Sequence, residues 1–143
     1  MTQFNDHPLW QSSLNPADAP AVQSLSPVAL AYLGDAVFEL YVRCCYLFPP
    51  RRIGDFHRRV VAQVRAEQQA QILTTLLPQL TDPEKEWVRR GRNAATSTSR
   101  RANPELYQAA SGLETLLGYL YLRDARRLDE LLALIELPDA APR

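Results

Sequence analysis

The chain has little of the material that disulfide bridges and zinc sites need, with 2 cysteines and 2 histidines among its 143 residues. Cys44 and Cys45 are adjacent, and neighbours in a helix point in different directions, which argues against a disulfide between them. We expect both to act as small apolar core residues. His7 and His57 lie far apart in the chain, so no cysteine–histidine cluster has the spacing of a zinc site.

Two further absences concern membranes and export. The sequence has no run of about 18 or more apolar residues without charge, so we expect no membrane span. Its first residues, MTQFNDHPLW, lack the basic start and the apolar core segment of a secretory signal. The sequence therefore predicts a cytoplasmic protein, and a reducing cytoplasm agrees with unpaired cysteines.

The chain also lacks net charge, which argues against a generally basic nucleic-acid-binding protein. The charges are nevertheless unevenly distributed. Residues 51–101 carry 11 basic and 5 acidic residues, a balance of +6, and the remainder carries 5 basic and 11 acidic residues, a balance of −6. A concentrated basic segment is expected for a polyanionic partner, although a solvated helix surface explains the same count equally well.

Helical patterns occupy most of the chain, and no strand-like alternation or internal repeat interrupts them. Apolar spacing and capping residues predict helices over about 26–48, 55–77, 81–90, 104–122 and 126–137. Gly91 is expected to end the third helix, and residues 92–103 are expected to form a polar, basic loop. We therefore expect an all-α domain over residues 24–137, between a flexible N-terminal tail of residues 1–23 and a loose C-terminal tail of residues 138–143.

The first expected helix, SPVALAYLGDAVFELYVRCCYLF, is apolar nearly all the way round, which predicts that it is buried. Ser26 is a good N-cap. Gly34 suggests a very close neighbour, because glycine is otherwise unfavourable inside a helix. Asp35 is costly to bury unless it is paired or bound to a metal ion, whereas Glu39 has Arg43 one turn away as a salt-bridge partner.

The fourth expected helix repeats this pattern, since it is mostly apolar yet carries Glu114 between Gly112 and Gly118. Two such helices can pack with their backbones close and their acids facing each other. Two bare carboxylates would repel there, and a divalent cation such as Mg²⁺ or Mn²⁺ would relieve the repulsion. The alternative is that Asp35 and Glu114 are ordinary surface residues or salt-bridge partners.

Three stretches of the sequence resemble motifs of one enzyme family. LAYLGDAVFELYV resembles the ribonuclease III motif E-x-x-E-F-L-G-D-A/S-V, and LETLLGYLYL, residues 113–122, resembles that family's second motif, D-x-x-E-A-L-I-G-A. RRGRNA, residues 89–94, resembles the K/R-G-R-N-A stretch of the Mini-ribonuclease III branch. The motifs follow one another in the family's order and spacing, and the resemblance covers residues from about 25 to 137. We expect no double-stranded-RNA-binding domain after them, which would also point to that branch.

The resemblance implies that Asp35 and Glu114 are the catalytic, metal-ligating residues, with Mg²⁺ as the cofactor and Mn²⁺ as a substitute. The chain departs from the family pattern at three positions, because Val28, Ala31 and Ser111 stand where the motifs carry acids. The Mini-ribonuclease III branch likewise lacks the motif glutamate next to L-G-D. The site therefore has fewer acidic ligands, and we expect water in the missing coordination positions. The sequence leaves open whether the site binds one metal ion or two.

The resemblance further implies the ribonuclease III helical fold, a homodimer and the metal-assisted hydrolysis of double-stranded RNA to 5′-phosphate and 3′-hydroxyl ends. Each site would cut one strand, so a two-fold dimer matches the duplex. Members of the Mini-ribonuclease III branch mature the ends of the large-subunit (23S) ribosomal RNA precursor, and a ribosomal protein is a further candidate partner. The apolar residues that we expect at the dimer interface are Tyr32, Phe38, Tyr41, Tyr46 and Phe48. Packing in the core of the domain is the competing explanation for these residues.

RNA binding must then come from the helical domain itself. A-form RNA is contacted mainly through phosphates and 2′-hydroxyl groups across its minor groove. We expect the basic helix end and the following loop to lie on the duplex, through Arg89, Arg90, Arg92, Asn93, Arg100 and Arg101. A merely solvated loop is the alternative.

Two other functions compete with the nuclease. The first is a non-catalytic RNA-binding or ribosome-assembly protein on the same fold. This function is favoured by the lack of acids at Val28, Ala31 and Ser111, and it is disfavoured by the presence of Asp35 and Glu114. The second is a helical protein–protein interaction module, which the clustered arginines disfavour. Salt-sensitive RNA binding would separate both RNA functions from this module, and metal-dependent cleavage would separate the nuclease from the binding protein.

Overall fold

The computed structural model describes residues 21–95 and 103–140. Within these ranges the regular structure is helical and no strand occurs, which confirms the expected all-α fold. The elements are α2 (Pro27–Tyr46), α3 (Ile53–Val64), α4 (Ala66–Leu76), the short 3₁₀ helix η3 (Leu77–Gln79), α5 (Asp82–Ala94), α6 (Pro104–Arg123) and α7 (Ala125–Ala133).

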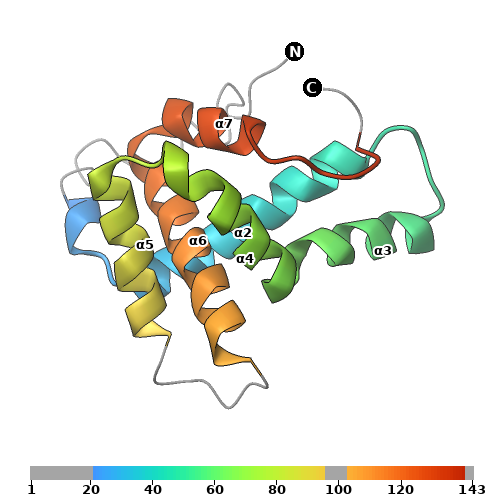
Figure 1. Cartoon of the computed structure of the whole chain (residues 1–143). Coiled ribbons are helices and arrows are strands. Elements are labelled where there is room, and N and C mark those ends of the chain that lie inside the picture. The colour runs from blue at the N-terminus through green and yellow to red at the C-terminus, as the bar shows by residue number, and fades with distance from the viewer. Residues whose placement is uncertain (1–20, 96–102, 141–143) are drawn as a thin grey trace.

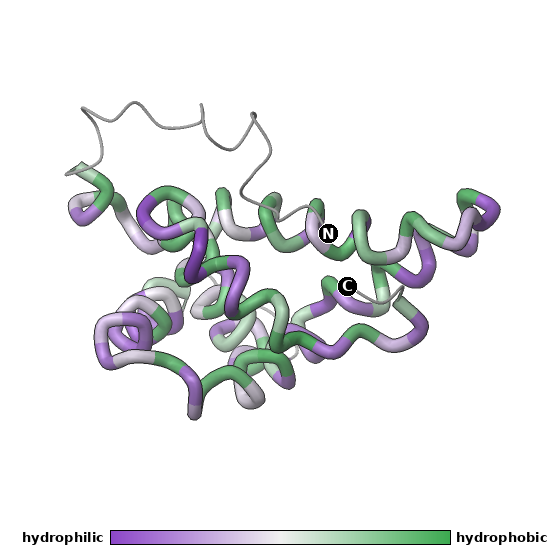
Figure 2. Tube along the Cα trace, turned by 90° about the horizontal axis from the view of Figure 1, so that it is seen from above, coloured by the Kyte–Doolittle hydropathy of each residue, from purple (hydrophilic) through white to green (hydrophobic). Residues whose placement is uncertain are grey.

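Helix α6 lies at the centre of the domain and packs against α2, α4 and α5, while α3 packs against α2 and α7 follows α6 at one end (Figure 1). Hydrophobic and hydrophilic residues alternate along the helices, as Figure 2 shows, which is the pattern of helices that cover a shared core. The fully buried leucines of α6 and α7 fill that core: Leu113, Leu116, Leu117, Leu128 and Leu131.

Helix α2 begins as predicted, because the Ser26 hydroxyl accepts a hydrogen bond from the backbone N–H of Ala29 at 3.1 Å. The expectation that it is buried nearly all the way round is wrong. One side packs into the core, but Tyr32 is 85% exposed and Phe48, just beyond the helix, is 62% exposed. The expectation that Cys44 is a core residue is likewise wrong, because it is exposed, whereas Cys45 is buried. A single domain of this size covers only one side of a helix that is apolar on several.

Glycines let α2 and α6 cross with their backbones in contact. A Cβ added at Gly34 would overlap the carbonyl oxygen of Glu114, and one added at Gly118 would overlap the carbonyl oxygen of Leu30. Both glycines are buried at the crossing. The close neighbour that Gly34 suggested in the sequence is therefore the backbone of α6 itself.

The helix predicted over residues 55–77 is wrong in one respect, because the chain forms two helices, α3 and α4, that are separated at Arg65. The ψ angle of Arg65 is 156°, which is extended backbone. The side chain of Gln69 donates a hydrogen bond to the carbonyl of Val64 at 2.9 Å and so satisfies a group that the break leaves without a helical partner. No glycine or proline marks this break in the sequence.

The predicted end of the third helix is also wrong, since α5 continues through Gly91 to Ala94. Its start is as predicted: Thr81 and Glu84 form a capping box, with the Thr81 N–H donating to the Glu84 carboxylate at 2.8 Å. Gly91 is a contact residue, because a Cβ there would overlap the side chain of Thr115 on α6. This glycine is explained by close packing against α6, and not by the end of a helix.

The last helix, expected over residues 126–137, runs only from Ala125 to Ala133. Leu134 caps it, and the N–H of Ile135 bonds back to the carbonyl of Leu132 at 3.1 Å, after which the chain leaves the helix. The side chain of Ile135 is still buried. Apolar spacing therefore continued past the point at which the helix ends.

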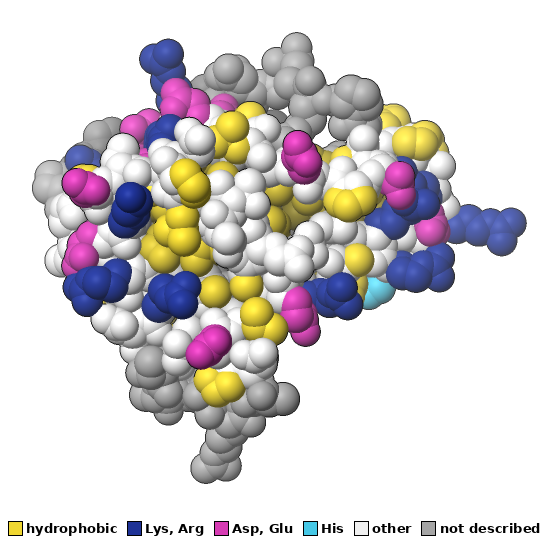
Figure 3. Space-filling model, viewed as in Figure 1, with side chains coloured by type: hydrophobic (Ala, Val, Ile, Leu, Met, Phe, Trp, Pro, Cys, Tyr) yellow, Lys and Arg dark blue, Asp and Glu magenta, His cyan; other side chains and the backbone are white. Residues whose placement is uncertain are grey.

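Charged side chains cover much of the surface, and Figure 3 shows basic side chains, here arginines, gathered over α3 at the right of the view. Exposed basic residues of that region include Arg52, Arg58 and Arg65. Among the described residues, no helix is both long enough and apolar enough to cross a membrane.

Both ends of the packed chain extend beyond the boundaries expected from the sequence. Residues 21–24 form a 3₁₀ turn in which Val22 is buried, and the Gln23 amide donates a hydrogen bond to the Tyr119 hydroxyl at 2.7 Å. These residues therefore belong to the domain and not to a flexible tail. The rest of that predicted tail, residues 1–20, lies outside the described residues.

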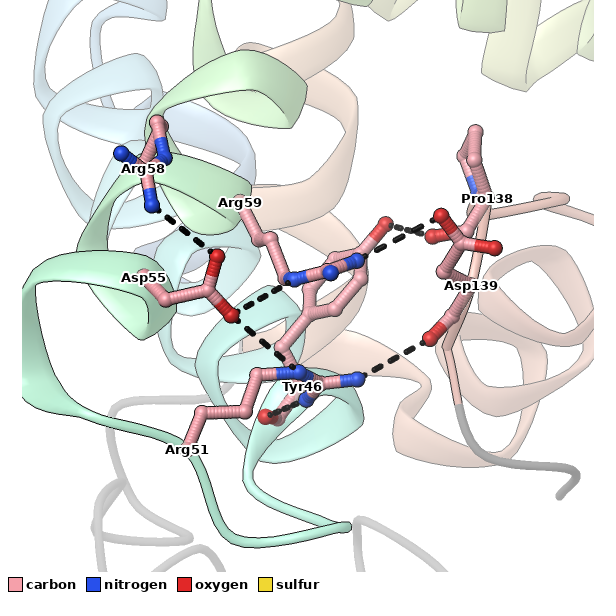
Figure 4. A network of polar contacts seen from close by, with 7 residues as sticks. All are labelled: Tyr46, Arg51, Asp55, Arg58, Arg59, Pro138 and Asp139. Carbon is pink, nitrogen blue, oxygen red and sulfur yellow. Dashed lines mark hydrogen bonds and ion pairs between the residues drawn. The ribbon is translucent and has the colours of Figure 1, made fainter.

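The start of the predicted C-terminal tail is bound to the ends of α2 and α3 (Figure 4). The Tyr46 hydroxyl donates a hydrogen bond to the carbonyl of Pro138 at 2.5 Å, and Arg51 donates to the carbonyls of Tyr46 at 2.5 Å and Asp139 at 3.3 Å. Arg59 lies between the carboxylates of Asp55 and Asp139, at 3.0 and 3.4 Å. Residues 138–140 are thus part of the domain, which sequence patterning missed.

A buried ion pair joins α7 to the start of α5. The Arg127 guanidinium donates to both carboxylate oxygens of Glu84, at 2.8 and 3.0 Å, and to the carbonyl of Gln79 at 2.8 Å. Glu84 is only 6% exposed. Burial alone raises the pKa of Glu84, but the bonds from Arg127 and from the Thr81 backbone outweigh it and hold the pKa below its ordinary value.

We predict that Arg127→Met lowers the free energy of unfolding by about 3 kcal/mol, because it leaves the buried Glu84 charge without its partner. Since the folded-state pKa of Glu84 is depressed, this stabilisation is present above the unfolded pKa, whose ordinary value is 4.5, and is lost as the pH falls through the folded pKa. Urea denaturation at several pH values measures both effects. The control, Arg126→Met, removes a side chain that is 88% exposed and should change stability little.

We predict that Gly118→Ala destabilises the fold by about 3 kcal/mol, because its Cβ has no room against the α2 backbone. Gly54→Ala is the matched control, since a Cβ there meets nothing within 4 Å and alanine favours the helix by about 0.5–1 kcal/mol. Thermal or urea unfolding distinguishes the two. Equal effects of both substitutions would contradict the backbone contact.

Candidate active site

The crossing of α2 and α6 brings Asp35 and Glu114 into one pocket. It has a volume of about 260 Å³ and lies between α2, the last turn of α5 and the first half of α6. Asp35 is exposed at the pocket, whereas Glu114 is partly buried. The lining residues are Pro27, Val28, Ala31, Tyr32, Asp35, Gly91, Ala94, Ala95, Tyr107, Ser111 and Glu114.

The two carboxyl groups act on each other. Burial raises the pKa of Glu114 to about 8, and the neighbouring charge of Asp35 and a hydrogen bond between the two side chains add to this effect. Among the described residues, no lysine or arginine offsets it. Near neutral pH, and without a bound cation, the pair therefore holds a proton on Glu114.

The donor set fits a hard divalent cation. Two carboxylates close enough to share a proton offer oxygen ligands, and Mg²⁺ is commonly bound through one or two carboxylates while it keeps several waters. A bound cation would replace the proton on Glu114, as metal binding generally deprotonates its ligands. Within the described residues, no group of three or more histidine, cysteine or acidic side chains could hold a metal ion.

Three positions at which the family motifs carry acids line the same pocket. Val28, Ala31 and Ser111 surround the two carboxylates, so the pocket wall is apolar or neutral where further acids would stand. Glu39, an acid one turn from Asp35, does not line the pocket and forms an ion pair with Arg43 at 2.7 Å. His57 is exposed on α3 and does not line the pocket either.

A threonine behind the pocket joins its three helices, and sequence reasoning missed this role. The Thr115 hydroxyl is fully buried, 2.7 Å from the carbonyl of Ser111 and 3.2 Å from the carbonyl of Pro27 at the start of α2. Gly91 of α5 packs directly on the same side chain. The only signal in the sequence was that Thr115 lies beside Glu114 in a helix with small residues at helical spacing.

Four of the six residues predicted to bind RNA lie on α5, next to the pocket. Arg89 is exposed and bonded to Glu86 at 2.8 Å, and the Arg90 guanidinium lies 4.3 Å from the centroid of the Trp87 ring. The side chain of Arg92 packs near Gly112, and Asn93 is exposed.

The expectation that Arg92 and Asn93 belong to a loop is wrong, because α5 extends to Ala94. The helix continues because Gly91 packs on α6 and does not end it. Arg100 and Arg101 lie outside the described residues.

Glu114 should make the metal-free protein sensitive to alkaline pH. Because its folded-state pKa of about 8 lies above the ordinary value of 4.5, its contribution to stability is fully present below the ordinary value and is lost as the pH rises through about 8. We therefore predict that, in EDTA, wild type loses stability between about pH 5 and about pH 9 relative to Glu114→Gln. Urea denaturation measures this difference. Glu105→Gln, at an exposed position of the same helix, should run parallel to wild type.

Comparisons with known proteins identify relatives of the whole chain. The Ribonuclease III domain model matches residues 28–125. The chain is 99% identical to "Mini-ribonuclease 3" of Synechocystis sp. over 143 residues, which covers 100% of both chains. It is 56% identical to "Mini-ribonuclease 3" of Synechococcus sp. over 119 residues, which covers 83% of this chain and 84% of that one.

A solved structure shows the same fold. The crystal structure of a protein from Fusobacterium nucleatum superposes with a TM-score of 0.71 at 27% sequence identity, covering 78% of this chain and 92% of the other. Together with the family model and the curated relatives, it confirms the resemblance that the three sequence motifs suggested. The chain therefore belongs to the ribonuclease III family of endoribonucleases, in its Mini-ribonuclease III branch.

Proposed function

We propose that this chain is a Mg²⁺-dependent endoribonuclease that cleaves double-stranded RNA at the pocket between α2, α5 and α6. The observation that carries the proposal is the pairing of Asp35 with Glu114, two acids that share one pocket and repel each other unless a proton or a cation lies between them. Mn²⁺ can substitute, because it prefers the same hard oxygen ligands.

Asp35 and Glu114 are the residues that would hold the cation. A bound Mg²⁺ supplies Lewis acidity and lowers the pKa of its coordinated water. The chain supplies the fixed positions of the two carboxylates, which the backbone contact of α2 with α6 sets. Glu114 would give up its proton to such a cation, and the small side chains of Ala31 and Ser111 would leave space for water and a phosphate. The products would carry 5′-phosphate and 3′-hydroxyl ends.

The basic end of α5 would hold the duplex beside this pocket. Arg89, Arg92 and Asn93 lie on the same helix as the pocket residues Gly91 and Ala94. Arg90 completes this group, stacked on Trp87, and Arg100 and Arg101 lie in the segment that joins α5 to α6. Arginine and asparagine side chains contact phosphates without reading sequence, so the affinity should depend steeply on salt.

Two copies of the chain would be needed to cut both strands. The exposed side of α2 carries an apolar stripe at helical spacing, formed by Tyr32, Ala36, Leu40 and Cys44, and the exposed Phe48 follows it. We propose this stripe as the dimer interface, since an exposed apolar patch marks an association surface. Phe38, Tyr41 and Tyr46, also considered for the interface, are buried in the core, so core packing explains them.

The substrate that we propose is the stem formed by the paired ends of the large-subunit (23S) ribosomal RNA precursor. The proposal follows from the relatives named Mini-ribonuclease 3 and from the branch that the motif RRGRNA resembles. It implies action in the cytoplasm, with a ribosomal protein on the precursor as a candidate partner. A duplex stem is also what a basic helix end can hold through shape and phosphates.

A second candidate function is a non-catalytic RNA-binding or ribosome-assembly protein. The observation in its favour is that Val28, Ala31 and Ser111 line the pocket in place of acids. The two functions share RNA binding and differ only in cleavage, so one experiment separates them.

That experiment is cleavage of an end-labelled RNA stem with Mg²⁺ and with EDTA. We predict that wild type cleaves only with Mg²⁺, and that Asp35→Asn reduces the rate by more than about a hundredfold, since even the loss of a group supporting a metal ligand costs 10–100-fold. Glu39→Gln is the control, because this acid on the same helix does not line the pocket. Equal RNA binding by wild type and Asp35→Asn, with cleavage by neither, would establish the non-catalytic function instead.

A further inference from the structure

We infer that Trp87 is a positioning residue for RNA binding, because it holds the guanidinium group of Arg90 in place beside the pocket. The inference rests on the proposed RNA binding by the end of α5 and deepens it, since it gives two neighbouring arginines different roles. The observation behind it is a stacked pair, in which the Arg90 guanidinium lies 4.3 Å from the centroid of the Trp87 ring.

The ring of Trp87 is itself fixed by other parts of the chain. Its side chain is buried, and it stacks on the ring of Tyr119 of α6, with the ring centroids 4.6 Å apart and an angle of 27° between the planes. The Tyr119 hydroxyl in turn accepts the hydrogen bond from the Gln23 amide, in the segment before α2. Arg90 therefore rests on a ring that has little freedom to move.

The stacked arrangement leaves the hydrogen-bond donors of Arg90 available to a ligand. An arginine that lies over an aromatic ring uses the flat face of its guanidinium group, whereas its N–H groups lie in the guanidinium plane and point outward from the edges. No hydrogen bond or ion pair joins these groups to another residue in the described part of the chain. Arg90 is thus held by its face while its donors stay free for a phosphate.

Arg89 differs from its neighbour, because its charge is compensated within the protein. Its Nε and Nη2 atoms donate to the two oxygens of the Glu86 carboxylate, at 2.8 and 2.5 Å. Glu86 lies four residues before Arg90, a spacing at which a glutamate commonly pairs with a basic residue, and yet it is bonded to Arg89. Of the two arginines, Arg90 is therefore the stronger ligand for a phosphate.

The geometry of α5 also places Arg90 on the side of the pocket. Gly91 and Ala94 are residues of α5 that line it. Each residue of an α-helix advances by about 100° around the axis, so Arg90 lies about 40° from Ala94 and Arg89 about 140° from it. A duplex that reaches the two acids would consequently meet Arg90 before Arg89.

Binding of a labelled RNA duplex in EDTA, where the proposed cleavage does not occur, tests the two roles at several salt concentrations. We expect Arg90→Met to weaken binding by about tenfold and to lower the slope of log affinity against log salt by about one, because one phosphate contact is lost. Arg89→Met should weaken binding much less. Arg126→Met is the control, since it removes the same charge from an 88% exposed position of α7 and should leave binding unchanged.

A double-mutant cycle tests the positioning role of Trp87. Trp87→Leu alone should weaken binding by about threefold, because Arg90 loses the ring on which it rests. The same substitution should have no further effect on binding in the Arg90→Met background, whereas a merely structural effect would be equally large in both. Trp87→Phe keeps an aromatic face and should lie between wild type and Trp87→Leu. It takes the place of Trp87→Leu in the cycle if that variant does not unfold cooperatively.

The outcomes separate this inference from the proposed function. Equal losses for Arg89→Met and Arg90→Met, or an effect of Trp87→Leu that persists in the Arg90→Met background, would overturn the inference and leave RNA binding standing. A wild-type chain that does not bind the duplex would overturn RNA binding and the inference with it. Binding that depends on Arg90 and Trp87 as expected, but without cleavage in Mg²⁺, would support the inference and establish the non-catalytic function.

Discussion

The rest of the structure depends on the direct contact between the backbones of α2 and α6. Gly34 and Gly118 permit this contact, since neither has a Cβ to keep the helices apart. The residue that follows Gly34 is Asp35, and the backbone that Gly34 touches belongs to Glu114. One packing constraint therefore fixes both the core and the spacing of the two acids, so the pocket cannot change shape without a cost to the fold.

The pocket itself could be predicted from the sequence because its acids stand out chemically. Carboxylates such as Asp35 and Glu114 are conspicuous in helices that are otherwise apolar, and a glycine lies close to each. Local signals also identified the starts of helices, at Ser26, Thr81 and Asn103, where a side-chain oxygen accepts a backbone hydrogen bond in each case. These features are properties of a few neighbouring residues, which a sequence displays directly.

Features that arise between distant residues could not be predicted in this way. Gly91 resembles a helix terminator in the sequence, but it serves a contact with Thr115, which lies on another helix. The helix break at Arg65 contains no glycine or proline. It is explained by a hydrogen bond from the side chain of Gln69 to the backbone carbonyl of Val64, which the break leaves without a helical partner. Arg51 is in the sequence only one of the 11 basic residues of residues 51–101, although its side chain joins the end of α2 to the C-terminal segment.

The same long-range contacts have a consequence for synthesis of the protein. Asp35 is synthesised early, whereas Glu114 belongs to the last third of the chain. The same third holds Pro138 and Asp139, whose backbone carbonyls accept hydrogen bonds from Tyr46 and Arg51. Tyr46 and Pro138 are 92 residues apart. Contacts of such long sequence separation form late in folding. The nascent chain therefore emerges with α2 lacking its main partner, and the pair of acids is assembled only as translation ends. A growing chain therefore lacks the pair of acids that we propose as the metal-binding site until α6 has been synthesised.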